Sequence, residues 1–217
     1  MSDLNPYRLR NQSGSLVAVG GMFSSIRRNR LAIRALIVLT GLMTLLCGIA
    51  SAEDVKTSDP NEVMAAFIRN FARYVDWPTN TFADNHSPWN IGILGDDSFG
   101  AVVEKSLTGR VEHERPFKVF HADKLDRLPR CQIVFIAYKD SAKRRAALNA
   151  LKNLPTLTVA DAPDFLREGG MIRFQVKDRV EMSINLDQAR AVSLNIPAKM
   201  LEVSRQVLEN GETRTLR

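Results

Sequence analysis

The most regular pattern of apolar and polar positions begins with the apolar run at residues 90–94, which is typical of a strand. Gly95 stops this run, and Asp96-Asp97 then offers side chains that can cap a helix. Apolar residues recur at helical spacing over residues 99–107, and Gly109 stands where a left-handed residue would close the helix. The pattern predicts a strand, a tight turn and a helix, which is the opening unit of an α/β domain.

The rest of the pattern predicts further strands and helices of one domain. The expected strands are 117–121, 132–138, 156–160, 171–176 and 179–186, and the expected helices are 59–77, 141–151, 187–193 and 197–208. Residues 132–138 are nearly all apolar, as in a strand covered on both faces. Lys177-Asp178 predicts a hairpin turn between the last two strands. We therefore expect a single three-layer α/β domain with a mixed, mostly parallel sheet and an antiparallel edge hairpin.

The first fifty residues have the pattern of an export signal. Basic residues between Arg27 and Arg34 precede an uncharged apolar run at residues 35–50, and Ala50-Ser51-Ala52 has the small residues of a cleavage site. The run is shorter than the ~20 apolar residues that a membrane-spanning helix needs. We expect residues 1–52 to be a leader with a cleavable signal peptide, with Met22 as an alternative start and an uncleaved anchor as the alternative fate. The α/β domain is then residues 53–217.

Removal of this leader changes the charge that the composition indicates. The chain has 30 Lys and Arg against 24 Asp and Glu, a formal net charge of +6. Six of the basic residues and one acidic residue precede Glu53, which leaves the remainder close to neutral, at +1. A nearly neutral domain gives no support for a nucleic-acid partner. Only Cys131 follows the leader, so no intrachain disulfide can form in the processed protein.

No motif in the chain supports catalysis. The glycines after the first strand lack the spacing of a dinucleotide-binding loop, and the three histidines are too scattered for a metal site. Cys131 begins an apolar strand, and we expect it to be a buried and inert thiol. Asp161, Asp164 and Glu168 are expected to cap a helix and to solvate a loop. The sequence therefore predicts a protein that is not an enzyme and has no cofactor or metal.

Aromatic residues on the first helix give a better indication of function. Phe67, Phe71, Tyr74 and Trp77 recur along it, which is typical of a helix that packs on the sheet. This helix lies outside the alternation of strands and helices, so it can also pack against another protein. In that interpretation Tyr74 and Trp77 are anchors of an interface, because aromatic residues are favoured there.

Six blocks of the sequence resemble the YfiR-like family. They are A-A-F-I-R-N-F-A-R-Y-V-D-W-P (65–78), I-G-I-L-G-D-D-S-F-G (91–100), C-Q-I-V-F-I-A-Y (131–138), L-T-V-A-D (157–161), G-G-M-I-R-F (169–174) and I-N-L-D-Q-A-R (184–190). The blocks follow the family's order and together cover residues 62–208. Several ordered blocks are far more specific than any single one.

The resemblance implies a periplasmic, non-enzymatic α/β protein. Members of this family bind the periplasmic part of an inner-membrane diguanylate cyclase and hold it inactive. Release, helped by an outer-membrane lipoprotein, raises cyclic di-GMP and promotes biofilm formation. Members form homodimers and commonly carry paired cysteines, whereas Cys131 stands alone here. Redox control through an intramolecular disulfide therefore does not transfer to this chain.

Two functions follow from these observations. The first is a periplasmic regulatory protein that represses a membrane diguanylate cyclase, with Phe71, Tyr74, Trp77, Met171 and Arg173 as the expected partner-binding residues. The alternative is a periplasmic small-ligand sensor that acts on a different membrane client. Such a sensor would use the cleft outside the carboxyl ends of the strands, where open α/β sheets bind ligands.

Overall fold

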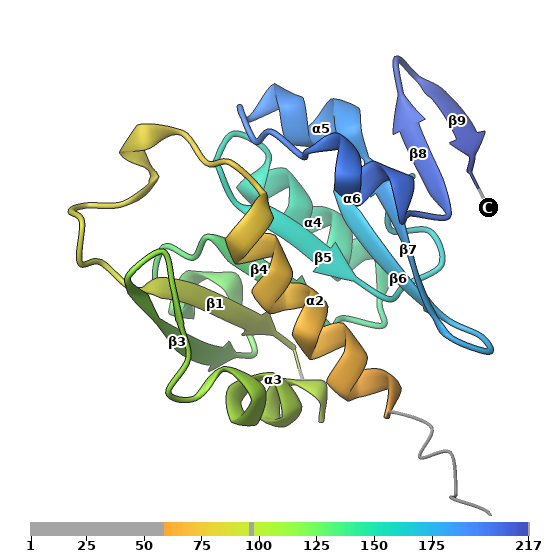
Figure 1. Cartoon of the computed structure of the whole chain (residues 1–217). Helices are drawn as coiled ribbons and strands as arrows, with labels where there is room; N and C mark the ends of the chain where they lie inside the picture. The colour runs from red at the N-terminus through yellow and green to blue at the C-terminus, as the bar shows by residue number, and fades with distance from the viewer. Residues whose placement is uncertain (1–58, 96–97, 217) are drawn as a thin grey trace, which may run out of the picture. The chain divides into compact units, whose positions relative to one another are not determined.

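Nine strands form one mixed sheet at the centre of the described chain (Figure 1). The computed structural model describes residues 59–95 and 98–216. The strands are β1 (Trp89–Leu94), β2 (Val111–Glu112), β3 (Arg115–Ala122), β4 (Ile133–Ile136), β5 (Leu157–Ala160), β6 (Ile172–Val176), β7 (Val180–Asn185), β8 (Gln206–Glu209) and β9 (Glu212–Thr215). Their order is β2-β3-β1-β4-β5-β6-β7-β8-β9. Hairpin pairs β2–β3, β6–β7 and β8–β9 are antiparallel and the other neighbours are parallel, which confirms the predicted sheet type.

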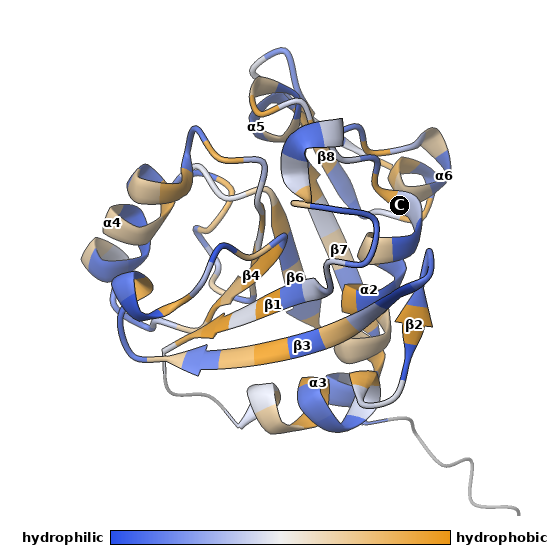
Figure 2. Ribbon diagram, turned by 90° about the vertical axis from the view of Figure 1, so that its left-hand side faces the viewer, coloured by the Kyte–Doolittle hydropathy of each residue, from blue (hydrophilic) through white to orange (hydrophobic). Residues whose placement is uncertain are grey.

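Helices cover both faces of this sheet, as the sequence predicts. The helices are α2 (Pro60–Tyr74), α3 (Phe99–Leu107), α4 (Ser141–Leu151), α5 (Leu186–Ala191) and α6 (Ala198–Glu202), with short 3-10 turns η1 (Thr79–Thr81) and η2 (Leu125–Arg127). Apolar residues of α2, α3, α5 and α6 join one buried cluster, and those of α4 join a second. Figure 2 shows α4 on one side of the sheet and α2 and α3 on the other. The three-layer α/β architecture is therefore confirmed.

Successive side chains of β4 pack alternately against the helices on the two faces of the sheet. Ile133 and Phe135 pack in the cluster beneath α2, whereas Val134 and Ile136 pack in the cluster beneath α4. Successive side chains of a strand point to opposite faces, so a strand covered on both sides must be apolar at every position. This confirms the expectation for residues 132–138.

The start of α2 forms as its sequence predicts. The side chain of Asp59 accepts a hydrogen bond from the Asn61 backbone N–H at 2.9 Å, and Pro60 occupies the first turn, where its missing N–H costs nothing. The helix ends at Tyr74, and extended backbone at Val75 leads into Trp77-Pro78. Residues 59–77 were expected to be helical, so the helix stops three residues early.

The unit that follows β1 also forms as predicted. Gly95 has a φ of +107°, and its N–H donates to the carbonyl of Ala122 at 2.8 Å. α3 follows, and Gly109 has the left-handed φ of +69° expected just after a helix. The expected caps Asp96 and Asp97 lie outside the described residues, as does the whole predicted leader.

The C-terminal prediction is wrong. Residues 197–208 were expected to form a helix, but α6 ends at Glu202, and Arg205 N–H donates to the carbonyl of Met182 at 2.7 Å. This bond starts β8 beside β7, and the turn Asn210-Gly211 returns the chain as β9. The hairpin β6–β7, expected at the sheet edge, therefore lies two strands inside it.

Within residues 59–95 and 98–216, no helix combines the length and the apolar character needed to cross a membrane.

Candidate protein-binding surface

Three phenylalanine rings fix α2 on the sheet. The ring of Phe71 lies 6.0 Å from that of Phe174 on β6, and Phe67 lies 6.3 Å from Phe71 and 5.7 Å from Phe174. Phe71 is fully buried, and Met171, just before β6, is 3% exposed. Phe71 and Met171 were expected to contact a partner, but their side chains belong to the core. They can affect a partner only by supporting the residues that lie above them.

Arg173 lies on the other face of the sheet from α2. It stands between Ile172 and Phe174, which both pack in the cluster beneath α2, so its side chain points away from that helix. There its Nη2 donates to Oε1 of Gln175 at 3.3 Å. The structure thus separates Arg173 from Tyr74 and Trp77, and the five expected residues do not form one surface.

Trp77 is partly buried just after α2. Its ring packs edge-on against Trp89 of β1, with centroids 5.0 Å apart. Backbone hydrogen bonds in both directions between Asp76 and Asn195, each of 3.0 Å, hold this segment against the chain before α6. The side chain of Asn195 also donates to Oδ2 of Asp76 at 2.9 Å. Trp77 therefore packs against the core and fixes the end of α2, and only part of its ring is exposed.

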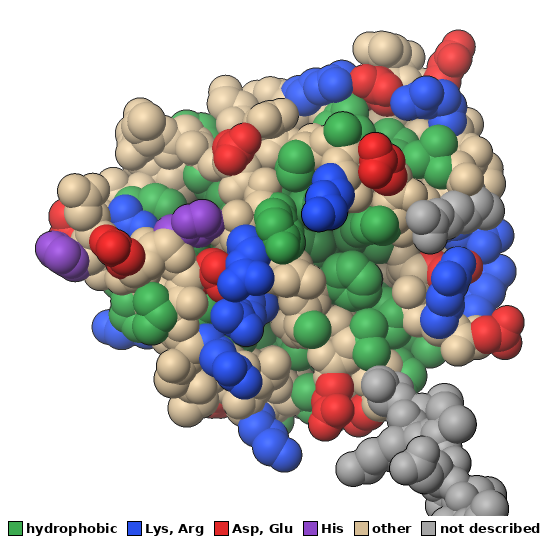
Figure 3. All heavy atoms as spheres, viewed as in Figure 1, with side chains coloured by type: hydrophobic (Ala, Val, Ile, Leu, Met, Phe, Trp, Pro, Cys, Tyr) green, Lys and Arg blue, Asp and Glu red, His purple; other side chains and the backbone are tan. Residues whose placement is uncertain are grey.

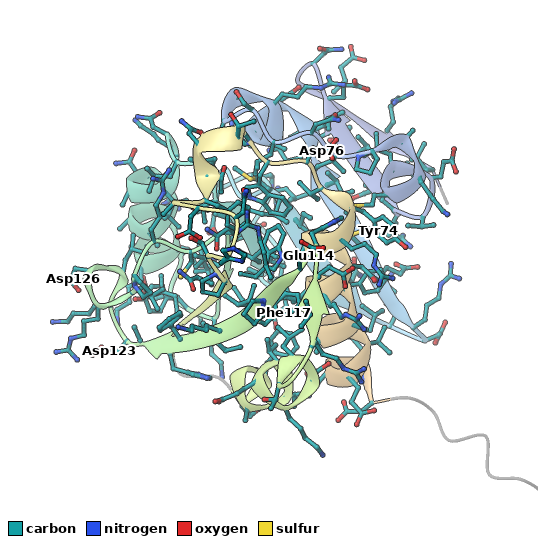
Figure 4. All side chains as sticks on the ribbon, turned by 60° about the vertical axis from the view of Figure 1, so that its left-hand side comes forward. Tyr74, Asp76, Glu114, Phe117, Asp123 and Asp126 are labelled. Carbon is teal, nitrogen blue, oxygen red and sulfur yellow. The ribbon has the colours of Figure 1, made fainter. Side chains whose placement is uncertain are left out.

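Tyr74 is the most exposed aromatic side chain of the described residues, at 44%. The guanidinium carbon of Arg73 lies 5.9 Å from the centre of its ring. Figure 4 shows Tyr74, Asp76 and Glu114 around the C-terminal end of α2. We call Tyr74, Asp76, His113 and Glu114 the α2 C-terminal surface.

A buried carboxylate fixes this end of α2 to the hairpin β2–β3. Glu112 accepts hydrogen bonds from Nε of Arg73 at 2.6 Å and from Nε of Arg69 at 3.2 Å, while its own residue is 7% exposed. Burial by itself would raise the pKa of Glu112, but the bonds and charges of Arg73 and Arg69 outweigh it and hold that pKa below its usual value. Because Arg69 and Arg73 are one turn apart on α2, the pair binds the carboxylate from the same side of the helix.

The tip of this hairpin is strained. His113 and Glu114 join Glu112 to Arg115 with φ values of +49° and +63°. Side chains other than glycine pay about 1–3 kcal/mol for each such residue, so neighbouring contacts must hold the turn in place. Nε2–H of His113 donates to the carbonyl of Arg73 at 2.9 Å, and Nε1–H of Trp89 donates to the carbonyl of Glu112 at 3.0 Å. These bonds and the Glu112 carboxylate fix the tip beside Tyr74.

Apolar side chains gather on the same face of the domain. Figure 3 shows hydrophobic side chains at the centre of the view, over the elements that Figure 1 labels α2 and α6, with basic side chains along one flank. Tyr74 is an exposed apolar residue of α2, and Val203, directly after α6, is 50% exposed. Phe67 and Leu201 are partly buried beside them. Exposed apolar area of this kind is typical of a protein-interaction surface when it is contiguous.

Two of the three acidic residues considered for catalysis, Asp164 and Glu168, have structural partners. Glu168 accepts two hydrogen bonds from Arg144, both of 2.7 Å, and the two side chains are 6% and 7% exposed. Asp164 pairs with Arg167 on the surface. The Cys131 thiol is buried at 4% exposure, as predicted, and this burial raises its pKa to about 12. Among the described residues, no group of three or more His, Cys, Asp or Glu could hold a metal ion.

A hollow lies where the alternative function would need it. It has a volume of about 520 Å³ and lies between η2 and α4, just beyond the carboxyl ends of β3 and β4. Tyr138 lies in its lining and donates its hydroxyl hydrogen to the carbonyl of Asp123 at 2.6 Å. Lys143 and Asp126 add opposite charges at its rim, and Ala147 adds apolar surface. The lining of the hollow therefore combines polar and apolar residues at the carboxyl ends of β3 and β4.

Sequence reasoning missed Glu112, His113 and Glu114. The contact between Glu112 and Arg73 spans 39 residues, and nothing in the local pattern marks it. Two basic residues four apart on a helix, Arg69 and Arg73, were the available signal that an acidic partner lies nearby.

One comparison with known proteins gives a match. A family model described as YfiR/HmsC-like matches residues 61–205 of this chain. A search of curated proteins gives no match.

Proposed function

Because this chain belongs to the YfiR/HmsC-like family, which implies a periplasmic regulator of a diguanylate cyclase, we propose that it represses an inner-membrane cyclase by binding the periplasmic part of that enzyme. Repression lowers cyclic di-GMP and, with it, biofilm formation. The family match is the observation that carries this proposal. Proteins of this family are regulators, and we propose no catalytic role for the chain.

The geometry of the α2 C-terminal surface supports a binding function. Tyr74 is an exposed aromatic residue on a helix whose inner side is fixed by Phe71 and whose end is fixed by Glu112. A surface held in one conformation loses little entropy when it binds, so it can bind with a modest contact area. Aromatic side chains are also the residues that most often carry the energy of an interface.

Binding alone does not repress an enzyme. A ligand shifts a conformational equilibrium only by its difference in affinity for the two states. We propose that the chain binds the inactive cyclase more tightly than the active one. A difference of about 3 kcal/mol would bias the cyclase roughly a hundredfold toward the inactive state.

Deletion of the gene tests this proposal in the cell. We expect cyclic di-GMP and biofilm to rise on deletion and to fall again when the wild-type chain is supplied. Tyr74→Ala should restore repression poorly, whereas Leu154→Ala should restore it fully, because Leu154 is 38% exposed beside α4, on the other side of the sheet. Cyclic di-GMP that is unchanged by deletion in every growth condition tested would contradict the proposal.

The alternative is a small-ligand sensor that acts on a different membrane client. The hollow of about 520 Å³ outside β3 and β4 favours this function, since open α/β sheets bind ligands at that position. A bound metabolite that co-purifies with the wild-type protein, and is lost with Lys143→Ala, would support it.

Three further expectations complete the proposal. We expect the protein to reach the periplasm by a signal peptide that is cleaved after Ala52, to form a homodimer, and to be released from the cyclase with the help of an outer-membrane lipoprotein. N-terminal sequencing of the exported protein, which should begin at Glu53, tests the first of these.

A further inference from the structure

Two hairpins of this chain use the same turn with different residues. His113-Glu114 joins β2 to β3, and Asn210-Gly211 joins β8 to β9 with φ values of +55° and +76°. Positive φ at both positions of a two-residue loop is the pattern of the type I′ turn, for which Asn-Gly is the favoured sequence. The second hairpin has that sequence. In the first, histidine tolerates positive φ better than most residues, whereas Glu114 lacks the freedom of the glycine that the turn favours.

Three contacts with α2 hold the strained turn in place. The Glu112 carboxylate binds Arg69 and Arg73 before it, and His113 donates to the carbonyl of Arg73. Backbone strain persists only where the surrounding structure determines the conformation, and such places cluster at binding sites. An Asn-Gly pair would relax this turn, but it would also remove two exposed side chains from the tip.

The Glu114 side chain at the tip is free to bind a partner. Glu114 is exposed and makes no ion pair with a described residue, and the carboxylate of Asp76 is bonded to the amide of Asn195 rather than to a cation. Arg69 and Arg73, the nearest basic residues of α2, are already engaged by Glu112. The C-terminal end of a 15-residue helix adds a partial negative charge here. The exposed ring of Tyr74, which already has the guanidinium of Arg73 5.9 Å from its centre, adds apolar contact area beside the carboxylates.

We propose that the His113-Glu114 tip is a recognition element that binds a basic segment of the cyclase's periplasmic part. A Lys or Arg side chain of that segment binds the Glu114 carboxylate, at the end of α2 where Figure 4 also places Tyr74 and Asp76. The inference rests on the proposed function, because it names the element of the α2 C-terminal surface that selects the partner. The strain is retained because the relaxed turn would lack the carboxylate and the imidazole.

Two variants separate the charge of the tip from its strain. Glu114→Gln keeps a side chain of the same shape and removes the charge. Glu114→Gly gives the second position of this turn the glycine of the other hairpin and keeps the hydrogen bond of His113. Glu212→Gln is the matched control, since Glu212 is an exposed acidic residue of the second hairpin that makes no ion pair with another described residue and lies on the opposite edge strand of the sheet. The probe is the purified periplasmic part of the cyclase whose activity the chain represses, titrated with protein obtained by expression of the full chain.

The expected results differ between the variants. Glu114→Gln should weaken binding about tenfold at low salt and flatten its dependence on salt, because a charge pair at the edge of an interface is screened by salt. Glu114→Gly should melt about 2–4 °C higher than wild type, because glycine adopts the positive φ without strain and the His113 hydrogen bond is kept. It should nevertheless bind at least about tenfold more weakly. Glu212→Gln should match wild type in both measurements.

Other outcomes would overturn the inference. A Glu114→Gly variant that binds as tightly as wild type shows that the tip does not touch the cyclase. One that melts no higher than wild type shows that the turn is not strained at Glu114. Variants that change self-association of the chain but not cyclase binding would assign the tip to a second copy instead. If wild type itself fails to bind the cyclase, the proposed function fails together with the inference, whereas equal binding by wild type and both variants removes the inference alone.

Discussion

Glu112 accepts a hydrogen bond from Nε of Arg73 at 2.6 Å, across 39 residues of sequence. This contact joins the last turn of α2 to the edge hairpin β2–β3. It also fixes the backbone beside Tyr74, the most exposed aromatic residue among those described. The α2 C-terminal surface therefore depends on a buried carboxylate that takes no part in the surface itself.

Replacement of this carboxylate should destabilise the fold. Glu112→Gln leaves Arg69 and Arg73 without their anion, and we expect the free energy of unfolding to fall by about 1–2 kcal/mol. The two arginine side chains are 32% and 43% exposed, so water compensates part of the loss. Urea unfolding measures the change. Glu104→Gln, which loses only an exposed pair with His121, should change the free energy of unfolding by less than about 0.5 kcal/mol.

The contribution of Glu112 should also depend on pH. Its pKa is lowered in the folded protein from an ordinary value of 4.5, so the folded state binds the proton less readily than the unfolded state. The stabilisation is therefore complete above that ordinary value and is lost as pH falls through the lowered pKa. Melting temperatures of wild type and Glu112→Gln, measured from neutral to acidic pH, should converge at the acidic end. A difference in melting temperature between the two proteins that stays constant over the whole pH range would show that the Glu112 charge does not stabilise the fold.

The buried ion pair Arg144–Glu168 should contribute more to the free energy of unfolding than the surface pair Asp164–Arg167. Removal of the carboxylate in Glu168→Ala leaves a guanidinium buried without its anion, which costs about 3–5 kcal/mol of unfolding free energy. Asp164→Ala breaks the neighbouring pair with Arg167, whose side chains are 53% and 83% exposed, and should cost less than about 1 kcal/mol. Urea unfolding of both variants provides the comparison. Similar small losses would show that water reaches Arg144.

Cys131 should react with a thiol reagent only after unfolding. Burial raises its pKa to about 12, so very little thiolate exists in the folded protein at mildly alkaline pH. With Ellman's reagent we expect almost no reaction under native conditions. In urea, one thiol should react per chain if the leader has been removed, and a second, Cys47, if it has been retained.

Much of the fold could be predicted because its signals are local. The cap at Asp59, the glycine turn at Gly95 and the uniformly apolar run of β4 each depend on neighbouring residues, and each forms as expected. The strand β9 has the sequence E-T-R-T and is exposed throughout, so no apolar pattern marks it. The Asn210-Gly211 pair before β9 is a typical hairpin turn, and it was the signal that the residues just before it form a strand instead of the end of the predicted helix 197–208.

The candidate site could be predicted only in part, because it depends on whether each side chain points toward the core or toward solvent. Phe71 and Tyr74 lie on the same helix, but Phe71 is fully buried and Tyr74 is 44% exposed. Helical periodicity gives the apolar face of α2 without its exact limits. Arg173 follows a simpler rule, since it alternates with the buried Phe174 and so must point away from α2. The Glu112 contacts bring together distant segments, and the sequence marks only one side of them, through the spacing of Arg69 and Arg73 on α2.

The most direct test of the account is the activity of the membrane cyclase with this protein added. The full-length cyclase is reconstituted in nanodiscs, which leave both its periplasmic and its cytoplasmic parts accessible, and the rate at which it forms cyclic di-GMP from GTP is measured as the protein is titrated. We expect the rate to fall at least about tenfold at saturation, as a repressor that prefers the inactive state requires, and to fall less with Tyr74→Ala. A rate that stays unchanged while the protein is shown to be bound, or an absence of any binding, would contradict the account.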